Sequence, residues 1–249
     1  MGLVGKTALV TGGSRGIGKA IALALAEAGA AVALTYYERA ESAQRVAESI
    51  EQQGGDALAL RLSLAEGASM DRLLAIVHAS YGPVHILVNN AAIAQEKPFL
   101  ALTEMDWSQM LTVNLQGPVR CCQAVVPDML AEGWGRIVNM VSIGAQVGGT
   151  NQMHYAAAKA GLMSVTRSLA RLYAHDGVTV NAVAPNLVAT DMTAQELASE
   201  AGQAKVASIP LRRIGTAEEV ASLVAYVCSP DAAYITGQCL NVNGGSYCG

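Results

Sequence analysis

Short runs of hydrophobic residues alternate along the chain with longer stretches in which hydrophobic residues recur every three or four positions. The runs lie at residues 6–11, 31–37, 56–64, 84–92, 135–142, 178–185 and 238–245. The helical spacing is found at residues 18–30, 38–55, 66–82, 103–130, 153–174 and 216–229. We expect a β-strand for each run and an α-helix for each periodic stretch.

This alternation predicts the fold class. The strands are continuous hydrophobic runs, as in parallel sheets that helices cover on both faces. Strand–helix alternation also implies right-handed crossovers between parallel strands. The sequence therefore predicts an α/β protein with a doubly wound, seven-stranded parallel sheet. No linker-like segment divides residues 1–249, so we expect a single domain.

One long stretch, residues 186–214, has no clear role in this alternation. It lies between the predicted strand 178–185 and the predicted helix 216–229. Insertions of this kind often close over a ligand. We therefore expect residues 186–214 to form a lid over a substrate site.

Composition argues against several classes of protein. The chain has 249 residues, of which 52% are hydrophobic and 14% are charged, which suffices for a large core. Its net charge is −4 and its basic residues are scattered, so we expect no nucleic-acid partner. Hydrophobic runs end well before ~18 residues and no signal-peptide pattern is present, so we expect a cytoplasmic protein without membrane spans.

Cysteine and histidine spacing predicts no metal site. The chain has five cysteines and four histidines, without a C-x-x-C motif or histidines at metal-ligand spacing. We expect buried or incidental thiols rather than disulfides. His154 is expected at a pocket edge or on the surface, and not as a catalytic base.

A glycine-rich segment, VTGGSRGIG at residues 10–18, joins the first predicted strand to the first helix. Gly12, Gly16 and Gly18 allow a tight turn and a close approach of pyrophosphate oxygens to the helix N-terminus. Glycine-rich turns are common, but the position between a strand and a helix indicates a dinucleotide site.

Residues near the end of the second strand bear on the choice between NAD and NADP. Tyr36 stands about where an acidic residue would bind the ribose 2′-hydroxyl of NAD. Arg15 can pair with a 2′-phosphate and Arg39 can assist, whereas Glu38 can repel a phosphate. We favour NADP(H) over NAD(H); a solvated helix start is the alternative for Glu38 and Arg39.

Tyr155 and Lys159 lie four residues apart in a predicted helix and therefore share one face. Tyrosine is ordinarily a poor base at neutral pH. An ammonium ~4 Å away, at an effective dielectric constant of ~20, favours the phenolate by ~4 kcal/mol. We therefore expect Lys159 to lower the pKa of Tyr155 and to make it a proton donor and acceptor near neutrality. An exposed, solvated pair is the alternative.

Polar residues at the ends of two other strands and in a helix extend this candidate site. Ser142 ends the fifth predicted strand, where its hydroxyl can bond a substrate carbonyl beside Tyr155. Asn114, in the predicted helix 103–130, can hold a water that passes protons to Lys159. Residues 89–92, NNAA, end the fourth strand near the point where the strand order reverses.

Over essentially its whole length the chain resembles the short-chain dehydrogenases/reductases. The resemblance rests on TGGSRGIG, NNAA, YAAAK and NAVAPNLVATDM, together with Asn114 and Ser142. It implies a single-domain Rossmann fold, usually in a homotetramer. It also implies a catalytic tetrad of Asn114, Ser142, Tyr155 and Lys159. In that family the tyrosine protonates the alkoxide, the serine polarises the carbonyl and the lysine binds the nicotinamide ribose.

The same resemblance implies a larger set of dinucleotide contacts. The expected cofactor-binding residues are Gly12, Ser14, Arg15, Gly16, Ile17, Gly18, Tyr36, Tyr37, Ser63, Leu64, Asn90, Ala91, Tyr155, Lys159, Pro185, Val188 and Thr190. Thr190 matches the threonine that holds the carboxamide. Ser63 stands in place of an aspartate that commonly contacts adenine. Asn186 stands in place of a glycine, and asparagine tolerates a positive φ.

Within the family, GWGRIVN and residues 209–245 resemble 3-oxoacyl-thioester reductases of fatty acid or polyketide biosynthesis. Such enzymes reduce a 3-ketoacyl group on acyl-carrier protein or coenzyme A with NADPH. Carrier-protein reductases have basic residues where this chain has Gly133 and Asp176, although Arg136, Arg167 and Arg171 are nearby. The alternatives are a dehydrogenase or reductase of free alcohols, diols or ketones and, in another class, a nucleotide-binding protein without turnover.

Overall fold

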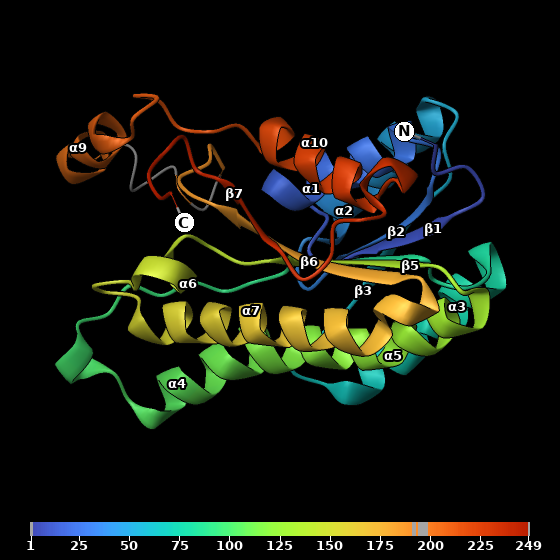
Figure 1. Cartoon of the computed structure of the whole chain (residues 1–249), viewed down its shortest axis with the longest axis horizontal. Coiled ribbons are helices and arrows are strands. Elements are labelled where there is room, and N and C mark those ends of the chain that lie inside the picture. The colour runs from blue at the N-terminus through green and yellow to red at the C-terminus, as the bar shows by residue number, and fades with distance from the viewer. Residues whose placement is uncertain (1, 191–192, 194–198, 249) are drawn as a thin grey trace.

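All seven hydrophobic runs form strands of one parallel sheet in the computed structural model (Figure 1). The structure describes residues 2–190, 193 and 199–248. The strands are β1 Thr7–Val10, β2 Ala31–Tyr36, β3 Ala57–Arg61, β4 Ile86–Asn89, β5 Gly135–Met140, β6 Val178–Pro185 and β7 Cys239–Val242. Their order is β3-β2-β1-β4-β5-β6-β7, and every pairing is parallel. The predicted fold class is confirmed.

Helices connect the strands on both faces of the sheet. The α-helices are α1 Gly16–Glu27, α2 Ala40–Gln52, α3 Gly67–Tyr81, α4 Glu104–Leu111, α5 Gly117–Glu132, α6 Gly144–Val147, α7 Met153–Tyr173, α9 Glu200–Ser208 and α10 Ala217–Cys228. Short 3₁₀ turns lie at η1 Phe99–Ala101, η3 Ala174–Asp176 and η4 Pro230–Ala232. No helix in the described ranges is both long and apolar enough to cross a membrane.

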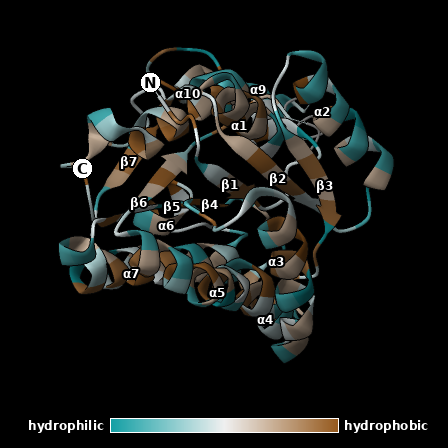
Figure 2. Ribbon diagram, turned by 90° about the vertical axis from the view of Figure 1, so that its right-hand side faces the viewer, coloured by the Kyte–Doolittle hydropathy of each residue, from teal (hydrophilic) through white to brown (hydrophobic). Residues whose placement is uncertain are grey.

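Two hydrophobic layers hold the helices to the sheet. Helices α1, α2 and α10 cover one face, and α3, α5 and α7 cover the other (Figures 1 and 2). Ile21 of α1 and Val224 of α10 are buried in the first layer, and Leu73 of α3 and Val125 of α5 in the second. Each such side chain contributes about 1.5–3 kcal/mol when it leaves water.

The connectivity creates a crevice at one end of the sheet. From β1 the chain runs outwards through β2 to β3, and then crosses back to β4 on the other side of β1. The segments that follow β1 and β4 therefore leave the sheet in different directions, and ligands bind at such a switch point. The carboxyl ends of β1, β4 and β5 are the expected place for a site.

The predicted helix 103–130 is interrupted. Helix α4 ends at Leu111, a π-helical turn (η2) spans Thr112–Gln116, and α5 follows directly. The break thus lies before Pro118, which occupies the first turn of α5. Such π-turns are often found at functional sites, and this one carries Asn114.

The segment expected to be a lid contains α9, which sequence periodicity did not predict. Within the segment 186–214, residues 191–192 and 194–198 lie outside the described residues. All five cysteines are free thiols, and Cys121, Cys122 and Cys228 are buried.

A buried polar network ties α7 to the sheet. Asn89 and Asn139 face each other across β4 and β5, and the Asn89 amide donates to the Asn139 Oδ1 atom at 2.8 Å. The Asn139 amide donates to the Thr166 hydroxyl at 2.9 Å, and that hydroxyl donates to the Leu162 carbonyl within α7. The network fixes α7 relative to the ends of β4 and β5.

We predict that Asn139→Ala lowers the free energy of unfolding by about 2–4 kcal/mol, because two buried hydrogen bonds are lost and their partners stay buried. Urea denaturation measures this change. Ser168→Ala, which removes an exposed hydroxyl from α7, is the control and should change stability by less than about 0.5 kcal/mol. Equal midpoints for the two variants would contradict the assigned role of the network.

Candidate active site

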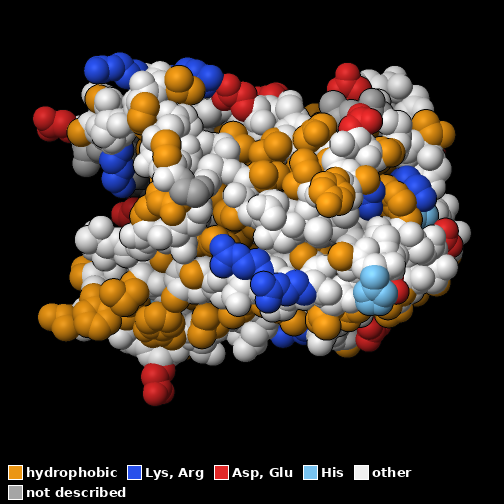
Figure 3. Space-filling model, in the orientation of Figure 1, with side chains coloured by type: hydrophobic (Ala, Val, Ile, Leu, Met, Phe, Trp, Pro, Cys, Tyr) orange, Lys and Arg blue, Asp and Glu red, His pale blue; other side chains and the backbone are white. Residues whose placement is uncertain are grey.

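A cavity of about 640 Å³ lies at the carboxyl ends of β1, β4, β5 and β6. Its walls come from the loop after β1, the segment after β4, the last residues of β5 and β6, and α7. Figure 3 shows an indentation at this end of the molecule, between the surface over α9 and the surface over the start of α4. The crevice expected from the strand order is therefore present.

All of the predicted cofactor-binding residues except Val188 line this cavity. Val188 is buried and pairs with Gly215 in a short bridge, so it supports the position of Thr190 rather than the cavity surface. Tyr155 and Lys159 of the predicted tetrad line the cavity, whereas Ser142 and Asn114 do not.

Several lining residues were not predicted. These are Thr35, Leu62, Ala65, Ala92, Ile93, Gln109, Thr112, Val113, Met140 and Val141. Five of them, Thr35, Leu62, Ala65, Ala92 and Val141, adjoin a predicted residue at the end of a strand, so strand ends were the available signal for these. Gln109, Thr112 and Val113 reach the cavity from α4 and the π-turn. A regular helix pattern does not predict which of their side chains face the site.

Glycines shape the loop after β1. Gly12 and Gly16 have φ values of 69° and 52°, in the region that side chains disfavour. A Cβ atom at Gly12 would lie 2.9 Å from Cα of Ala91, and one at Gly18 would collide with the Gly12 carbonyl. The Asn90 side chain holds this turn by donating to the carbonyls of Thr11 and Gly12 at 3.0 and 3.1 Å.

The loop fits a dinucleotide pyrophosphate. Helix α1 begins at Gly16, and its first turn contains no acidic residue. Arg15 precedes the helix and its side chain does not cap the first N–H groups. The positive end of the helix dipole and the backbone N–H groups therefore favour an anion at this wall of the cavity.

Aromatic and charged residues form the other end of the cavity. Lining residues here are Tyr36, which ends β2, the next three residues Tyr37, Glu38 and Arg39, and Arg15. The Arg61 guanidinium lies 5.5 Å from the ring centre of Tyr37 and donates to its carbonyl. This end thus combines a stacking surface with several positive charges and one carboxylate.

Two substitutions relative to the family pattern have different outcomes. Ser63 lines the cavity, as expected, and its backbone N–H donates to the Ser69 hydroxyl. Asn186 does not have the positive φ that we considered, because Arg212 is the only described non-glycine residue with one. The Asn186 amide instead donates to the Ser246 hydroxyl at 2.8 Å.

The lysine and tyrosine of α7 meet the end of β5. Lys159 is 1% exposed, and its ammonium donates to the Met140 carbonyl at 2.8 Å. The Ser142 hydroxyl lies close enough to Tyr155 to oppose the rise in the pKa of its phenol, and the Ser142 oxygen accepts from the Gly144 N–H at 3.1 Å. Tyr155, Lys159 and Ser142 thus converge at one point beside the cavity.

Burial controls the acidity of both α7 residues. It raises the pKa of Tyr155 to about 12, against the opposing effect of the Ser142 hydrogen bond. It lowers the pKa of Lys159 to about 8. The expectation that Lys159 lowers the pKa of Tyr155 to near neutrality is therefore wrong. The ammonium is directed at the Met140 carbonyl and lies 5.7 Å from the centre of the phenol ring.

Asn114 lies behind the cavity wall. It is buried on the π-turn, its Oδ1 atom accepts from the Ile93 N–H at 3.1 Å, and its amide donates to the Ile93 carbonyl at 2.9 Å. Its side chain therefore anchors the segment after β4, rather than being free to hold the water that we expected.

The residues compared with the docking residues of carrier-protein reductases differ in how exposed they are. Gly133 ends α5 with a φ of 59°, a conformation that favours glycine over a basic residue. Arg136 is only 3% exposed, because it stacks on Trp134 and donates to the Gly135 carbonyl. It cannot meet a partner protein, so of the three nearby arginines only Arg167 and Arg171 are available for docking. Arg167 and Arg171 are exposed on α7.

Known proteins resemble this chain over nearly its full length. A family model described as enoyl-(acyl carrier protein) reductase, which belongs to the short-chain dehydrogenases/reductases, matches residues 12–247. The 3-oxoacyl-[acyl-carrier-protein] reductase FabG of Vibrio cholerae is 44% identical over 247 residues, which cover 99% of each chain. That of Staphylococcus epidermidis is 40% identical over 242 residues, 97% of this chain and 99% of the relative.

Among solved structures, a protein from Beutenbergia cavernae matches with a TM-score of 0.92 and 37% identity, over 98% of both chains. That protein was designated an NAD(P)-dependent gluconate 5-dehydrogenase and contains NADP at low occupancy. Sequence, fold and site therefore agree: the chain belongs to the short-chain dehydrogenase/reductase family and is a nicotinamide-dependent oxidoreductase.

Proposed function

We propose that the protein is an NADPH-dependent reductase of 3-oxoacyl thioesters carried on acyl-carrier protein or coenzyme A. The observation that carries this proposal is the convergence of Ser142, Tyr155 and Lys159 beside a cavity with a glycine-lined phosphate wall. The FabG relatives, at 40–44% identity, support the substrate class.

The proposed reaction adds two electrons and two hydrogens to the 3-keto group. A reduced nicotinamide, when bound, supplies hydride to the carbonyl carbon. The π electrons of the carbonyl then move onto its oxygen, and Tyr155 donates its hydroxyl proton there to give the 3-hydroxyacyl product. The Ser142 hydroxyl orients that oxygen, and the Lys159 ammonium, held at the Met140 carbonyl, would bind the nicotinamide ribose.

A neutral Tyr155 suits reduction. An alkoxide is a much stronger base than a phenolate, so a tyrosine with a pKa of about 12 still donates to it. Lys159 with a pKa of about 8 is mostly an ammonium at neutral pH. The pair is therefore in the protonation state that reduction requires. Asn114, the fourth residue of the proposed tetrad, acts through the Ile93 backbone as a positioning residue.

The charge near the end of β2 favours NADPH. Arg15 and Arg39 line the cavity there, Arg61 lies over Tyr37, and position 36 is a tyrosine instead of an acid. Two or three cations near one phosphate outweigh the single carboxylate of Glu38. Tyr36, Tyr37, Ser63 and Leu64 then face the adenosine, and Thr190 faces the carboxamide.

A free hydroxyl or ketone compound is the second candidate substrate. The Beutenbergia cavernae protein designated a gluconate 5-dehydrogenase favours it. Position 133 is a glycine in the left-handed conformation instead of a basic residue, and Arg136 is buried. The surface expected to meet a carrier therefore lacks two cations. A nucleotide-binding protein without turnover has no need of Ser142, Tyr155 and Lys159 in one place.

The remaining expectations concern the assembly and the lid. We propose a cytoplasmic homotetramer, because the family resemblance implies one. We also propose residues 186–214 as a lid, because Thr190, which belongs to this segment, lines the cavity. The exposed hydrophobic side chains of Phe99, Leu100 and Met105 are available for contacts with substrate or partner.

We predict that the protein reduces acetoacetyl-coenzyme A with NADPH faster than it reduces or oxidises a panel of free ketones, diols and sugar acids. Tyr155→Phe should lower this rate by at least about 100-fold, because the proton donor is lost. NADPH binding by the variant, measured by fluorescence titration, should stay within about twofold of wild type. Faster turnover of a free polyol, or full activity of Tyr155→Phe, would contradict the proposal.

We predict that Arg15→Ala weakens NADPH binding by about 10–100-fold, since a charge-assisted contact to phosphate is worth about 1.5–3 kcal/mol. NADH binding should change by less than about twofold. Lys19→Ala is the control. It removes an exposed cation of α1 that does not line the cavity, and it should leave both affinities unchanged. Equal losses for the two dinucleotides would refute the 2′-phosphate contact.

A further inference from the structure

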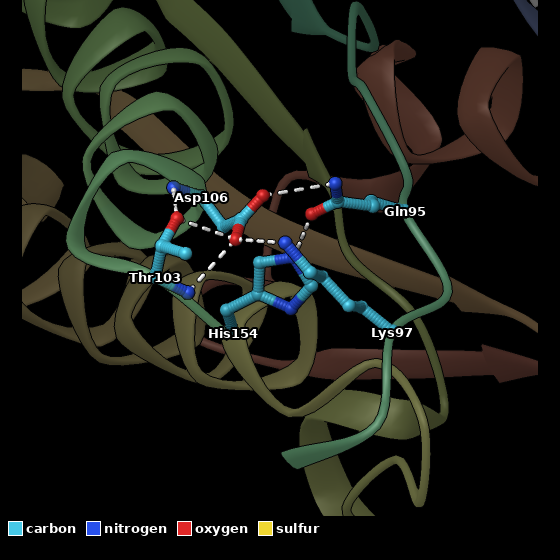
Figure 4. Close-up of polar contacts among 5 residues, drawn as sticks. All are labelled: Gln95, Lys97, Thr103, Asp106 and His154. Carbon is cyan, nitrogen blue, oxygen red and sulfur yellow. Dashed lines mark hydrogen bonds and ion pairs between the residues drawn. The ribbon is translucent and has the colours of Figure 1, made fainter. Parts of the chain in front are cut away.

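Five polar side chains join the segment after β4 to the starts of α4 and α7 (Figure 4). Gln95 and Lys97 come from that segment, Thr103 and Asp106 from the start of α4, and His154 from the first turn of α7. We call these residues the polar clamp. None of them lines the cavity, and the proposed reaction uses none of them.

Asp106 is the centre of the polar clamp. Its carboxylate accepts hydrogen bonds from the Thr103 N–H and hydroxyl at 2.8 and 2.6 Å, the Lys97 ammonium at 2.5 Å and the Gln95 amide at 3.0 Å. The hydrogen bond from Lys97 is the main cause that holds the pKa of Asp106 far below its usual range. Asp106 is therefore a carboxylate at neutral pH.

This fixed charge determines the orientation of Gln95 and the tautomer of His154. Because Asp106 can only accept, the Gln95 side chain must turn its NH₂ group to it. The Gln95 carbonyl oxygen then faces the His154 Nε2 atom, 2.9 Å away. Nε2 must consequently carry the proton and donate it.

His154 is fully buried, contrary to its expected place at a pocket edge or on the surface. Its ring meets Trp107 edge to face, with 6.1 Å between ring centres. Its Nδ1 atom has no hydrogen-bond partner among the described residues, so the contact with Gln95 is the side chain's polar anchor. Burial lowers the pKa of His154, which keeps the ring neutral.

This partly buried hydrogen bond connects two walls of the active site. His154 immediately precedes Tyr155 in the first turn of α7. Gln95 is two residues from Ile93, which lines the cavity and is held by Asn114. Movement of either end would therefore change the position of the Tyr155 hydroxyl relative to the cavity wall that faces it.

A second contact between the segment after β4 and the start of α7 lies at the surface. The Gln152 amide meets the Glu96 carboxylate at 3.4 Å on the surface, where water can replace either partner. Water cannot easily replace the Gln95 contact of His154, since that ring is inaccessible. The Gln95–His154 bond thus restricts α7 more strongly than its exposed neighbour does.

From this geometry we infer that the Gln95–His154 hydrogen bond positions Tyr155 for proton transfer. The inference rests on the proposed function, in which Tyr155 is the proton donor. His154 and Gln95 are positioning residues, because neither touches the cavity. Misplacement of a reacting group by about 1 Å can slow a reaction by about 100-fold.

The test compares His154→Leu and Gln95→Met with His154→Gln, whose amide can still donate to Gln95. We expect the first two variants to lower kcat by about 10–100-fold and to raise the solvent isotope effect on kcat, because proton transfer becomes slower. NADPH affinity should stay within about twofold, and His154→Gln should recover most of kcat. The double variant should be no slower than the slower single variant, since both remove one bond.

Gln152→Met removes the exposed contact between the same segments and is the matched control, with unchanged kcat and isotope effect. Wild-type kcat and isotope effect in His154→Leu, even with a lower melting temperature, would overturn the inference. Equal impairment of His154→Gln, with a parallel loss of NADPH affinity, would also overturn it. Wild-type protein inactive on acetoacetyl-coenzyme A would instead refute the proposed substrate, and the same variants would then be compared on whichever ketone the wild type reduces.

Discussion

A cation inside a protein must find hydrogen-bond acceptors, and this constraint determines the arrangement around Lys159. The ammonium is 1% exposed and donates to the Met140 carbonyl at the end of β5. The observed position of α7 along β5 brings the ammonium to this acceptor. That position places Tyr155, one turn earlier in α7, beside Ser142, which follows β5 after one intervening residue. The geometry of the proposed proton donor therefore follows from where a buried charge can be accommodated.

Other polar contacts reinforce this position of α7. The Asn89–Asn139–Thr166 network holds the helix along its length, and the Gln95–His154 bond holds its first turn. Asn114 holds the opposite cavity wall through Ile93. Asn89, Asn114, Asn139, His154 and Thr166 are buried, and a polar group is costly to bury unless it is paired. Polar groups that would weaken an ordinary core are thus concentrated where the site needs rigid walls.

Much of the fold and part of the site could be predicted from the sequence. Hydrophobic runs located all seven strands, because a strand covered on both faces has little freedom in composition. Gly12, Gly16 and Gly18 marked the phosphate loop, since close approach to Asn90 at Gly12 and Gly18 and a positive φ at Gly12 and Gly16 disfavour side chains there. Tyr155 and Lys159 were recognisable because helical spacing alone brings them to one face.

What could not be predicted depends on the packing of distant segments. The π-turn at Asn114 has no periodic signal, and its partner Ile93 is far away in the chain. The burial of Arg136 depends on Trp134, and that of His154 on Trp107 and Gln95. The pKa of Tyr155 was predicted in the wrong direction, because spacing along a helix does not show how much water reaches the hydroxyl or where the ammonium points. How far a side chain is removed from water, and where it points, are properties of the folded chain.

The central claim, that Lys159 is a buried cation held at the end of β5, can be measured directly. The Nζ resonance of ¹⁵N-labelled lysine, assigned to Lys159 by its loss in Lys159→Met, would be followed as the pH is raised. Burial predicts that this resonance titrates with a pKa of about 8. A pKa at the ordinary lysine value of 10.5 would mean that the ammonium lies in water, and would contradict the account.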